Sequence, residues 1–344
     1  MERLYLPKRR ANLKIIHTLH WVQFAGTERV CVDLCNEMAK QNEVVVLSNK
    51  DISAYLQENV KFINFNFEKN RYNPLFLMKT ARLLDELGAD IIQAHNTKEL
   101  EIMRYAMRFC KKKIPIVATR HNAEFKKKFA LADLGVGVSE ETMKFINSKK
   151  NILITNGANY KNPKFIKISD KFSILGVGRL SDVKGWELLI KALARVKFDF
   201  KLVILGDGDD REKLQNLINS LNLQEKVELR GFVENVQDFV YSCDLQVIAS
   251  KEEGLSITLI EAIFYAKLLI ASNIANHDKL IGKELVFDRD EEILASKLNE
   301  IYENYDKFVE IFAQVKAKKD EFSQEKMAKK YLVAYQNLIK EFQK

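Results

Sequence analysis

Short apolar runs alternate with amphipathic segments along most of the chain. Runs of about four to eight apolar residues are typical of strands buried in a parallel sheet, and the longer amphipathic segments between them are typical of connecting helices. The first half of the chain therefore predicts a series of βα units. Its expected strands are residues 14–19, 43–48, 60–65, 91–94, 116–119, 135–138 and 151–155, and its expected helices are residues 27–40, 73–87, 99–111 and 140–147.

The same alternation restarts after residues 159–170, a segment with several lysines and Pro163 that reads as a linker. The expected strands of the second half are residues 172–177, 201–205, 227–230, 245–249 and 268–271, and the expected helices are residues 186–194, 210–221, 236–241 and 257–265. The pattern predicts an α/β protein of two Rossmann-like, doubly wound domains. Such sheets bind ligands at the carboxyl ends of their strands, and we expect the two domains to face each other across a cleft.

The pattern also predicts where the domains begin and end. Residues 1–158 form the expected N-terminal domain, residues 159–170 the linker, and residues 171–320 the C-terminal domain. Residues 321–344 read as a long amphipathic helix with no strand after it. We expect this helix to pack across the interface and cross back to the first domain.

Length and composition agree with two domains. The chain has 344 residues, 47% of them hydrophobic and 30% charged, which is ordinary for a soluble protein with a substantial core. The basic N-terminus lacks the apolar region of a signal peptide, and no apolar stretch reaches the roughly 20 residues that cross a bilayer. We expect a cytoplasmic protein that is either soluble or peripheral at the inner face of the cell membrane. The four cysteines have the spacing of neither a zinc site nor a disulfide framework, and buried thiols are expected at Cys31, Cys35, Cys110 and Cys243.

Positive charge is concentrated in the first half. Residues 1–160 hold 26 Lys and Arg against 17 Asp and Glu, whereas the remainder holds 29 against 30. This asymmetry indicates an anionic partner such as a membrane surface, a phosphorylated lipid or a nucleic acid, or else only well-solvated faces. Aromatic residues are not interleaved with the lysine clusters, which disfavours single-stranded nucleic acid.

The segment Lys251–Ala262 carries the most informative motif. Glu253 falls in a strand-to-helix loop, and Glu261 lies one or two turns into the following helix. Gly254 allows the backbone to approach a ligand closely, and the first amides of the helix form an anion site. One loop thus offers a carboxylate for sugar hydroxyls, amides for phosphate and a second carboxylate for ribose. The alternative is that Glu253 caps the helix and Glu261 lies on the surface.

Three other loops follow predicted strands of the second half. Gly178 and Arg179 precede Lys184 just before a helix, and two cations at a helix start suit a diphosphate. A surface arginine and an ordinary turn glycine would give the same pattern. The turn Gly206-Asp207-Gly208 could hold a metal but reads better as a tight strand-to-helix turn. Gly231 and Phe232 could present backbone to a nucleobase.

In this order the motifs resemble those of family-4 glycosyltransferases, which are retaining enzymes of the GT-B fold. The first half adds Gly26-Thr27-Glu28-Arg29-Val30, similar to that family's Gly-Gly-x-Glu-Arg-Val loop. It also adds the segments Asp90–His95, Ala118–His121, Val138-Ser139 and Thr155-Asn156-Gly157. The resemblance covers residues 13–285.

The resemblance implies roles for individual residues. Arg179 and Lys184 would neutralise the diphosphate of a UDP-sugar or GDP-sugar donor, Glu253 would hold the donor sugar, and Glu261 the ribose. No metal or other cofactor is implied. Donor-binding positions carried over from the family are Gly26, Gly178, Gly206, Asp207, Gly208, Gly231, Phe232, Gly254, Leu255, Ser256, Thr258, Leu259 and Glu261.

Two histidines match positions on the acceptor side of the family's cleft. His95 and His121 both end predicted strands, where α/β sites form. The family pattern implies a site role for each, and neither is assigned as a general base, because the leaving phosphate of a retaining transfer can itself take the acceptor proton. A lone histidine is otherwise more often a structural residue.

The chain also departs from the family pattern. Ala25 stands where the family often has a glycine, Ala266-Lys267 replaces a Gly-x-Pro turn, and residues 274–277 replace a glycine-rich loop near the nucleotide. These differences leave the donor open.

The sequence therefore predicts a retaining, metal-independent glycosyltransferase that moves a sugar from a nucleotide donor to a hydroxyl of a glycan or glycolipid. The expected setting is assembly of cell-surface polysaccharide, lipopolysaccharide or lipid-linked oligosaccharide, with the basic first domain touching an anionic membrane. Two alternatives remain: a sugar-nucleotide epimerase of the same fold, and a non-catalytic protein that binds nucleotides or polyanions.

Overall fold

The computed structural model describes residues 12–20, 26–121, 127–159, 161–253, 255–274 and 277–343. The chain divides into two compact units. The first, here the first domain, comprises residues 1–138, 142–155 and 327–344. The second comprises residues 139–141 and 156–326 and is called the second domain.

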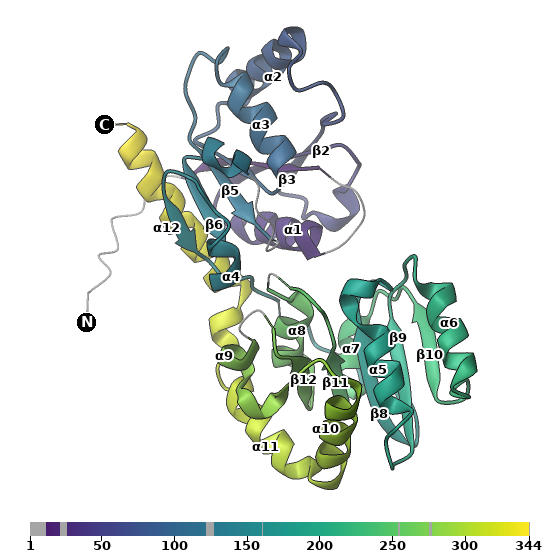
Figure 1. The fold of residues 1–344 in the computed structure, drawn as a ribbon. Helices are drawn as coiled ribbons and strands as arrows, with labels where there is room; N and C mark the ends of the chain where they lie inside the picture. Colours follow the sequence, from purple (N-terminus) through teal and green to yellow (C-terminus); the bar gives the residue numbers. More distant parts are fainter. Residues whose placement is uncertain are drawn as a thin grey trace. The chain divides into compact units, whose positions relative to one another are not determined.

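The first domain is built on a seven-stranded parallel sheet in the order β3-β2-β1-β4-β5-β6-β7 (Figure 1). Its strands are β1 (Lys14–Leu19), β2 (Glu43–Ser48), β3 (Val60–Asn64), β4 (Ile91–Ala94), β5 (Ile116–Arg120), β6 (Leu134–Gly137) and β7 (Asn151–Leu153). The central strands β1, β4 and β5 are buried almost throughout, which is why they read as continuous apolar runs. Every strand expected from the apolar pattern is present, with ends that differ by at most two residues.

Helices cover both faces of this sheet. They are α1 (Gly26–Met38), α2 (Pro74–Leu87) and α3 (Thr97–Ala106), with 3-10 turns η1 (Ser53–Tyr55) and η2 (Lys127–Leu131). The single turn α4 (Glu140–Met143) begins in residues of the second domain and ends in residues of the first. The side chain of Asn73 caps the start of α2, Pro74 occupies its first turn, and Gly88 ends it in a left-handed conformation. The predicted helices at 99–111 and 140–147 were too long, since α3 ends at Ala106 and α4 at Met143.

The C-terminal helix α12 (Gln324–Phe342) packs on the first domain through a buried polar network. The hydroxyl of Tyr335 donates to Oε1 of Gln93 at 2.8 Å, and Nε2 of Gln93 donates to Oγ1 of Thr119 at 2.9 Å. The hydroxyls of Thr119 and Tyr331 lie 2.9 Å apart. Because each buried polar group finds a partner, these bonds fix the place of the helix on the sheet. The prediction that the last helix returns to the first domain is confirmed.

The second domain is built on a six-stranded parallel sheet in the order β10-β9-β8-β11-β12-β13. Its strands are β8 (Phe172–Val177), β9 (Phe200–Leu205), β10 (Val227–Gly231), β11 (Leu245–Ile248), β12 (Leu269–Ser272) and β13 (Val286–Phe287). Its helices are α5 (Trp186–Leu193), α6 (Arg211–Ser220), α7 (Val236–Ser242), α8 (Ile257–Tyr265), α9 (His277–Ile281), α10 (Glu291–Glu303) and α11 (Tyr305–Lys316), with the 3-10 turns η3 (Asp182–Lys184), η4 (Lys283–Leu285) and η5 (Lys319–Phe322). The apolar pattern located the strands through β12, whereas β13 and α9 to α11 were not predicted.

None of the helices in the described residues has the length and apolar character that a membrane span requires.

Candidate functional site

The loops that follow β8 and β11 meet at the carboxyl edge of the second sheet. Nζ of Lys184, at the end of η3, lies 2.6 Å from Oε1 of Glu253, and Oγ of Ser250 donates to the same oxygen at 2.8 Å. Both charged side chains are mostly buried, with exposures of 25% for Lys184 and 13% for Glu253. Glu253 therefore faces Lys184 across the sheet edge, and the N-cap position of the following helix is occupied by Ser256.

Arg179 belongs to the same edge, in the loop that leaves β8. Its backbone carbonyl accepts a hydrogen bond of 2.8 Å from the indole of Trp186, which anchors this loop to the first turn of α5. Its side chain is exposed and makes no ion pair with the described residues. The backbone of Arg179 is thus fixed in the loop that leads to Lys184, and its side chain is exposed.

The turn after β9 is a strand-to-helix turn in which only glycine fits. Gly206 has a φ of +129°, and a Cβ there would come within 2.2 Å of the carbonyl oxygen of Gly178. A Cβ on Gly208 would lie 2.4 Å from the carbonyl oxygen of Leu180. Asp207 accepts hydrogen bonds of 2.8 Å from Nε of Arg211 and from the amide of Gly208. These contacts support the tight-turn interpretation over a metal site, and they give the Asp207 carboxylate a local structural role.

The strand β10 ends in Gly231, and the next residue is one of the most exposed large apolar side chains of the described residues. Phe232 is 70% exposed. Gly231 has a φ of +83°, and its carbonyl accepts a 2.8 Å bond from the amide of Gly206. The loop after β10 is thereby tied to the loop after β9, with an aromatic ring left open to solvent.

The start of α8 offers amides and buried apolar side chains. Leu255, Ser256 and Leu259 are buried, so a ligand at this point would meet their backbone. The side chain of Ser256 makes no capping bond, and the first amides of any helix have no acceptor within the helix. Thr258 and Glu261 lie in the first two turns and are partly buried. Gly254 falls outside the described residues.

His277 is a residue at this edge that the sequence interpretation treated only as a departure from the family. It is fully buried, and its Nδ1 donates to the carbonyl oxygen of Ser272 at 2.9 Å. Burial lowers the pKa of its imidazole, while the charge of Glu253 acts in the opposite direction. Its place in the segment that follows β12, at the start of α9, is the signal that could have indicated it, because site residues of α/β sheets follow the strands.

In the first domain, the predicted histidines gather at the carboxyl edge of the sheet. Nδ1 of His95, after β4, lies 3.4 Å from Nε2 of His121, after β5. Burial lowers the pKa of both imidazoles, to about 4 for His121, where the charge of Arg120 contributes as well. Gly26 begins α1 and is exposed, and residues 21–25 before it lie outside the described residues.

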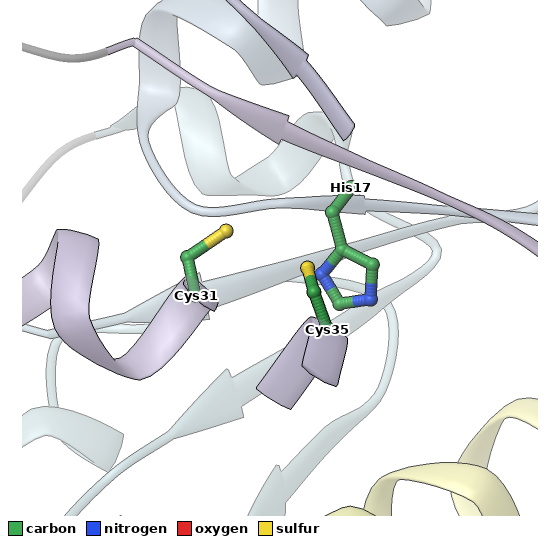
Figure 2. A group of neighbouring side chains, drawn as sticks. All are labelled: His17, Cys31 and Cys35. Atoms are coloured by element: carbon green, nitrogen blue, oxygen red, sulfur yellow. The ribbon is translucent and has the colours of Figure 1, made fainter. Parts of the chain in front are cut away.

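Behind His95 lies a third histidine together with two cysteines. His17 of β1 sits beside Cys31 and Cys35 of α1, and ligand atoms of the three residues lie within 4.8 Å of one another (Figure 2). All four cysteines are free and buried, as predicted. Their spacing did not show that a histidine joins two of them. A closed structural zinc site uses four ligands, and Nδ1 of His17 already lies 3.1 Å from Nε2 of His95. The group thus consists of two thiols packed against a hydrogen-bonded imidazole.

Two family models account for most of the chain. The family described as Glycosyl transferases group 1 matches residues 160–319, and the one described as Glycosyltransferase Family 4 matches residues 24–148. The chain belongs to glycosyltransferase family 4. It has the GT-B fold, and the resemblance inferred from the motifs is confirmed.

Curated relatives of this family-4 chain are similar over parts of their length. An N-acetylgalactosaminyltransferase from Campylobacter jejuni that acts on a diphospho-undecaprenol saccharide is 49% identical over 98 residues, which is 28% of this chain and 27% of that protein. An uncharacterized glycosyltransferase from Methanocaldococcus jannaschii is 43% identical over 97 residues, or 27% of this chain and 24% of that protein. These alignments span only about a quarter of either relative. A second Campylobacter jejuni enzyme, an α-1,4-N-acetyl-D-galactosaminyltransferase, is 26% identical over 86% of this chain and 90% of its own length.

Solved structures resemble the whole chain. A glycosyltransferase from Rickettsia africae matches 96% of this chain and 99% of its own with a TM-score of 0.82 and 21% identity. Anabaena HepE in complex with UDP-glucose matches 95% of this chain and 100% of its own with a TM-score of 0.81 and 18% identity. At these identities the likeness shows the fold.

Proposed function

We propose that this chain is a retaining glycosyltransferase that moves a sugar from a nucleoside-diphosphate donor to a hydroxyl of a glycan or glycolipid. The observation that carries the proposal is the pairing of Lys184 with Glu253 at 2.6 Å, at a sheet edge whose β8 loop also carries the exposed side chain of Arg179. The three side chains come from two loops at one sheet edge, where ligands of doubly wound sheets bind.

The charges suit the two ends of a nucleotide sugar. Arg179 and Lys184 would hold the diphosphate, whose negative charge grows as the glycosyl bond breaks. Glu253 would accept hydrogen bonds from hydroxyls of the sugar. Its partner Lys184 would then contact both the carboxylate and the diphosphate, so one lysine would link the two halves of the donor. With two cations and the amides of α8 available, the proposed reaction requires no metal.

The nucleoside would lie along the loops after β9 and β10. Phe232 offers an exposed ring on which a base can stack, and Gly206, Gly208 and Gly231 allow close approach of backbone to ligand. Glu261 lies just over one turn into α8 and would bind ribose hydroxyls. Asp207, which is engaged with Arg211, would contribute through the shape of its turn.

In the proposed chemistry, the departing phosphate accepts the proton of the acceptor hydroxyl. Retention requires the acceptor to attack from the face that the leaving group vacates, so the phosphate oxygen is close enough to receive that proton. The residues of this chain would orient the two substrates and stabilise the diphosphate. In the first domain, His95 and His121 would contact the acceptor side.

The acceptor class is proposed from the relatives and from charge. The first Campylobacter relative is named for a diphospho-undecaprenol substrate, the second for an undecaprenol-linked one, and a Rhizobium meliloti relative that is 35% identical over 104 residues is named for lipopolysaccharide core biosynthesis. The excess positive charge of residues 1–160 would favour contact with an anionic membrane. We therefore place the activity in the assembly of lipid-linked or cell-surface glycans.

The test is a transfer assay with a panel of UDP-sugars and GDP-sugars and with polyprenyl-diphosphate and lipopolysaccharide-core acceptors. Transfer to one acceptor class with an α-linked product from an α-linked donor supports the proposal. Arg179→Ala should lower kcat by about 10²-fold or more, because one stabilising donor is lost. Exposed Arg195, in the turn after α5 and paired with Glu291, provides the control Arg195→Ala. Donor turnover that needs no acceptor would indicate the epimerase, and equal rates in both arginine variants would refute the assigned site.

A further inference from the structure

Three histidine side chains of the first domain form one continuous chain from the core to the sheet edge. Nδ1 of His17 lies 3.1 Å from Nε2 of His95, and Nδ1 of His95 lies 3.4 Å from Nε2 of His121. The ring planes differ by 23° and 19°, and the ring centroids are 5.5 Å and 5.6 Å apart. Because the facing nitrogens are much closer than the ring centres, the rings meet edge to edge, as hydrogen-bonded imidazoles do.

This geometry allows only two arrangements of hydrogens. A neutral imidazole donates from one nitrogen and accepts at the other. Both contacts join an Nδ1 to an Nε2, so in a neutral chain all three rings carry the hydrogen either on Nδ1 or on Nε2. In the first arrangement His17 donates to His95, which donates to His121, and His121 presents an Nδ1–H. In the second the direction is reversed, and His17 carries its hydrogen on Nε2.

The buried end of the chain distinguishes the two arrangements. Nε2 of His17 is buried and has no hydrogen-bond partner in the part of the chain that the structure describes. Cys35 lies on the Nδ1 side of the ring (Figure 2), so neither thiol gives Nε2 a partner. A buried N–H without an acceptor is rarer in proteins than a buried acceptor without a donor. The hydrogen of His17 therefore belongs on Nδ1, where it has an acceptor.

The neutral state of the His95 and His121 imidazoles has a physical basis. Burial lowers the pKa of His95, with further contributions from the neighbouring His17 and His121. Burial also lowers the pKa of His121, and the positive charge of Arg120 next to it acts in the same direction. Both rings are thus uncharged at neutral pH, and each has one nitrogen that donates and one that accepts.

We propose that His17 is a positioning residue that fixes the Nδ1–H tautomer of His95 and, through it, of His121. His121 then presents a hydrogen-bond donor, and not a base, to the substrate. The inference that His121 meets substrate rests on the proposed function, whereas the tautomer does not. A donor at this position agrees with a retaining transfer in which the phosphate takes the proton, because the enzyme then needs no histidine base.

The first test reads the tautomers directly. Long-range ¹H–¹⁵N spectra of the labelled full-length protein at pH 7.5 assign the protonated nitrogen of each imidazole. We expect Nδ1–H at His95 and His121 in the wild type, and a loss of this single tautomer in His17→Phe. His277 is the internal control, because its Nδ1 donates to a carbonyl oxygen in the second domain. Hydrogen on Nε2 of His121 in the wild type, or unchanged rings in His17→Phe, would overturn the proposal.

A pair of conservative variants separates positioning from packing. His17→Asn can place an amide N–H near the former Nδ1, whereas His17→Gln places one near Nε2. We expect the Asn variant to keep the wild-type tautomers and kcat, and the Gln variant to lose both. Thermal unfolding checks that each variant is folded, and if His17→Phe fails this check the Asn and Gln variants decide the question.

Kinetics then tests the consequence for the reaction. In His17→Phe and His17→Gln we expect kcat for transfer to fall by about 10²-fold, the usual loss when one catalytic donor is misplaced, with an unchanged KM for the nucleotide sugar. An altered tautomer with a normal kcat would overturn the positioning role. If the wild type transfers sugar to no acceptor, the proposed function fails, and the ring spectra still decide the tautomer.

Discussion

Lys184 and Glu253 lie 69 positions apart in the sequence and meet at 2.6 Å, where Nζ of the lysine donates to Oε1 of the glutamate. The glutamate also accepts from Ser250, so its carboxylate is held by two donors from two loops. The pair joins the β8 loop to the β11 loop within one domain. Residues that the motifs assigned to the diphosphate and to the sugar are thus in direct contact.

This contact predicts strong coupling between the two residues in catalysis. Lys184→Met and Glu253→Gln should each lower kcat/KM by about 10²-fold or more, because each removes a charged group from the donor site. The double variant should lose much less than the product of the two effects, since the residues act as a unit. Steady-state transfer kinetics for the four proteins measure the coupling. Glu252→Gln, on the exposed neighbour, is the control and should behave as the wild type. Independent, multiplicative losses would contradict a shared role.

Phe232 should contribute to nucleotide affinity and not to stability. Its ring is 70% exposed, so Phe232→Ala removes little packing. Loss of base stacking should weaken nucleoside-diphosphate binding by about 1–3 kcal/mol, or roughly 5- to 150-fold in Kd. Isothermal titration calorimetry measures the change, and Tyr241→Ala, at an exposed tyrosine of α7, is the control. Equal Kd values in both variants would show that the nucleobase does not stack on Phe232.

Alanine substitutions at Gly206 and Gly88 distinguish the cost of backbone strain from the cost of steric overlap. Both have positive φ, +129° and +62°, but a Cβ on Gly206 would lie 2.2 Å from a carbonyl oxygen, whereas nothing lies within 4 Å of one on Gly88. Gly88→Ala should cost about 1–2 kcal/mol for its left-handed conformation. Gly206→Ala should cost more, and it should also weaken nucleotide binding because the turn carries the donor loop. Urea unfolding and calorimetry test both points, and equal destabilisation would contradict the steric argument.

The buried histidines predict an acid-sensitive first domain. Burial lowers the pKa of His121 in the folded protein to about 4, below its unfolded value of about 6.5. The unfolded state therefore binds more protons as the pH falls between these values, and the free energy of unfolding decreases. The loss begins near pH 6.5 and levels off below about pH 4. In His121→Gln this part of the pH dependence should disappear, as followed by urea unfolding at several pH values. His20→Gln, at a histidine paired with Glu68, serves as the comparison.

The polar network under α12 should hold the C-terminal helix in place. Tyr335→Phe leaves Oε1 of Gln93 without the donor it has in the native protein, which should cost about 1–3 kcal/mol. Amide hydrogen exchange should then be faster in α12 and unchanged in the helices of the second domain. Tyr72→Phe, at a tyrosine that is 61% exposed, is the control. Unchanged exchange in Tyr335→Phe would show that apolar packing alone holds the helix.

The expected strands agree closely with the structure because parallel strands buried on both faces leave a local mark, a short apolar run. Such an apolar run is clear in the sequences of β1, β4 and β8, whose ends were predicted without error. The region after β12 was not predicted. Its strand β13 has two residues, too few to show any alternation, and Asn304 separates α10 from α11 without a proline or glycine. The start of α10 could have been predicted, because Asp290 is a typical N-cap residue. Its side chain accepts hydrogen bonds from the amides of Glu292 and Ile293.

By itself, the sequence determined the two-domain α/β architecture, the family, and the loops in which the site residues lie, because periodicity and loop motifs are properties of neighbouring residues. Only the tertiary structure decided which of those residues touch. The contact of Lys184 with Glu253, the bond from His17 to His95 and the burial of His277 all join or enclose segments that are distant along the chain. Such contacts depend on strand order and register, which fix the distance between loops and leave no mark in the local pattern of either one.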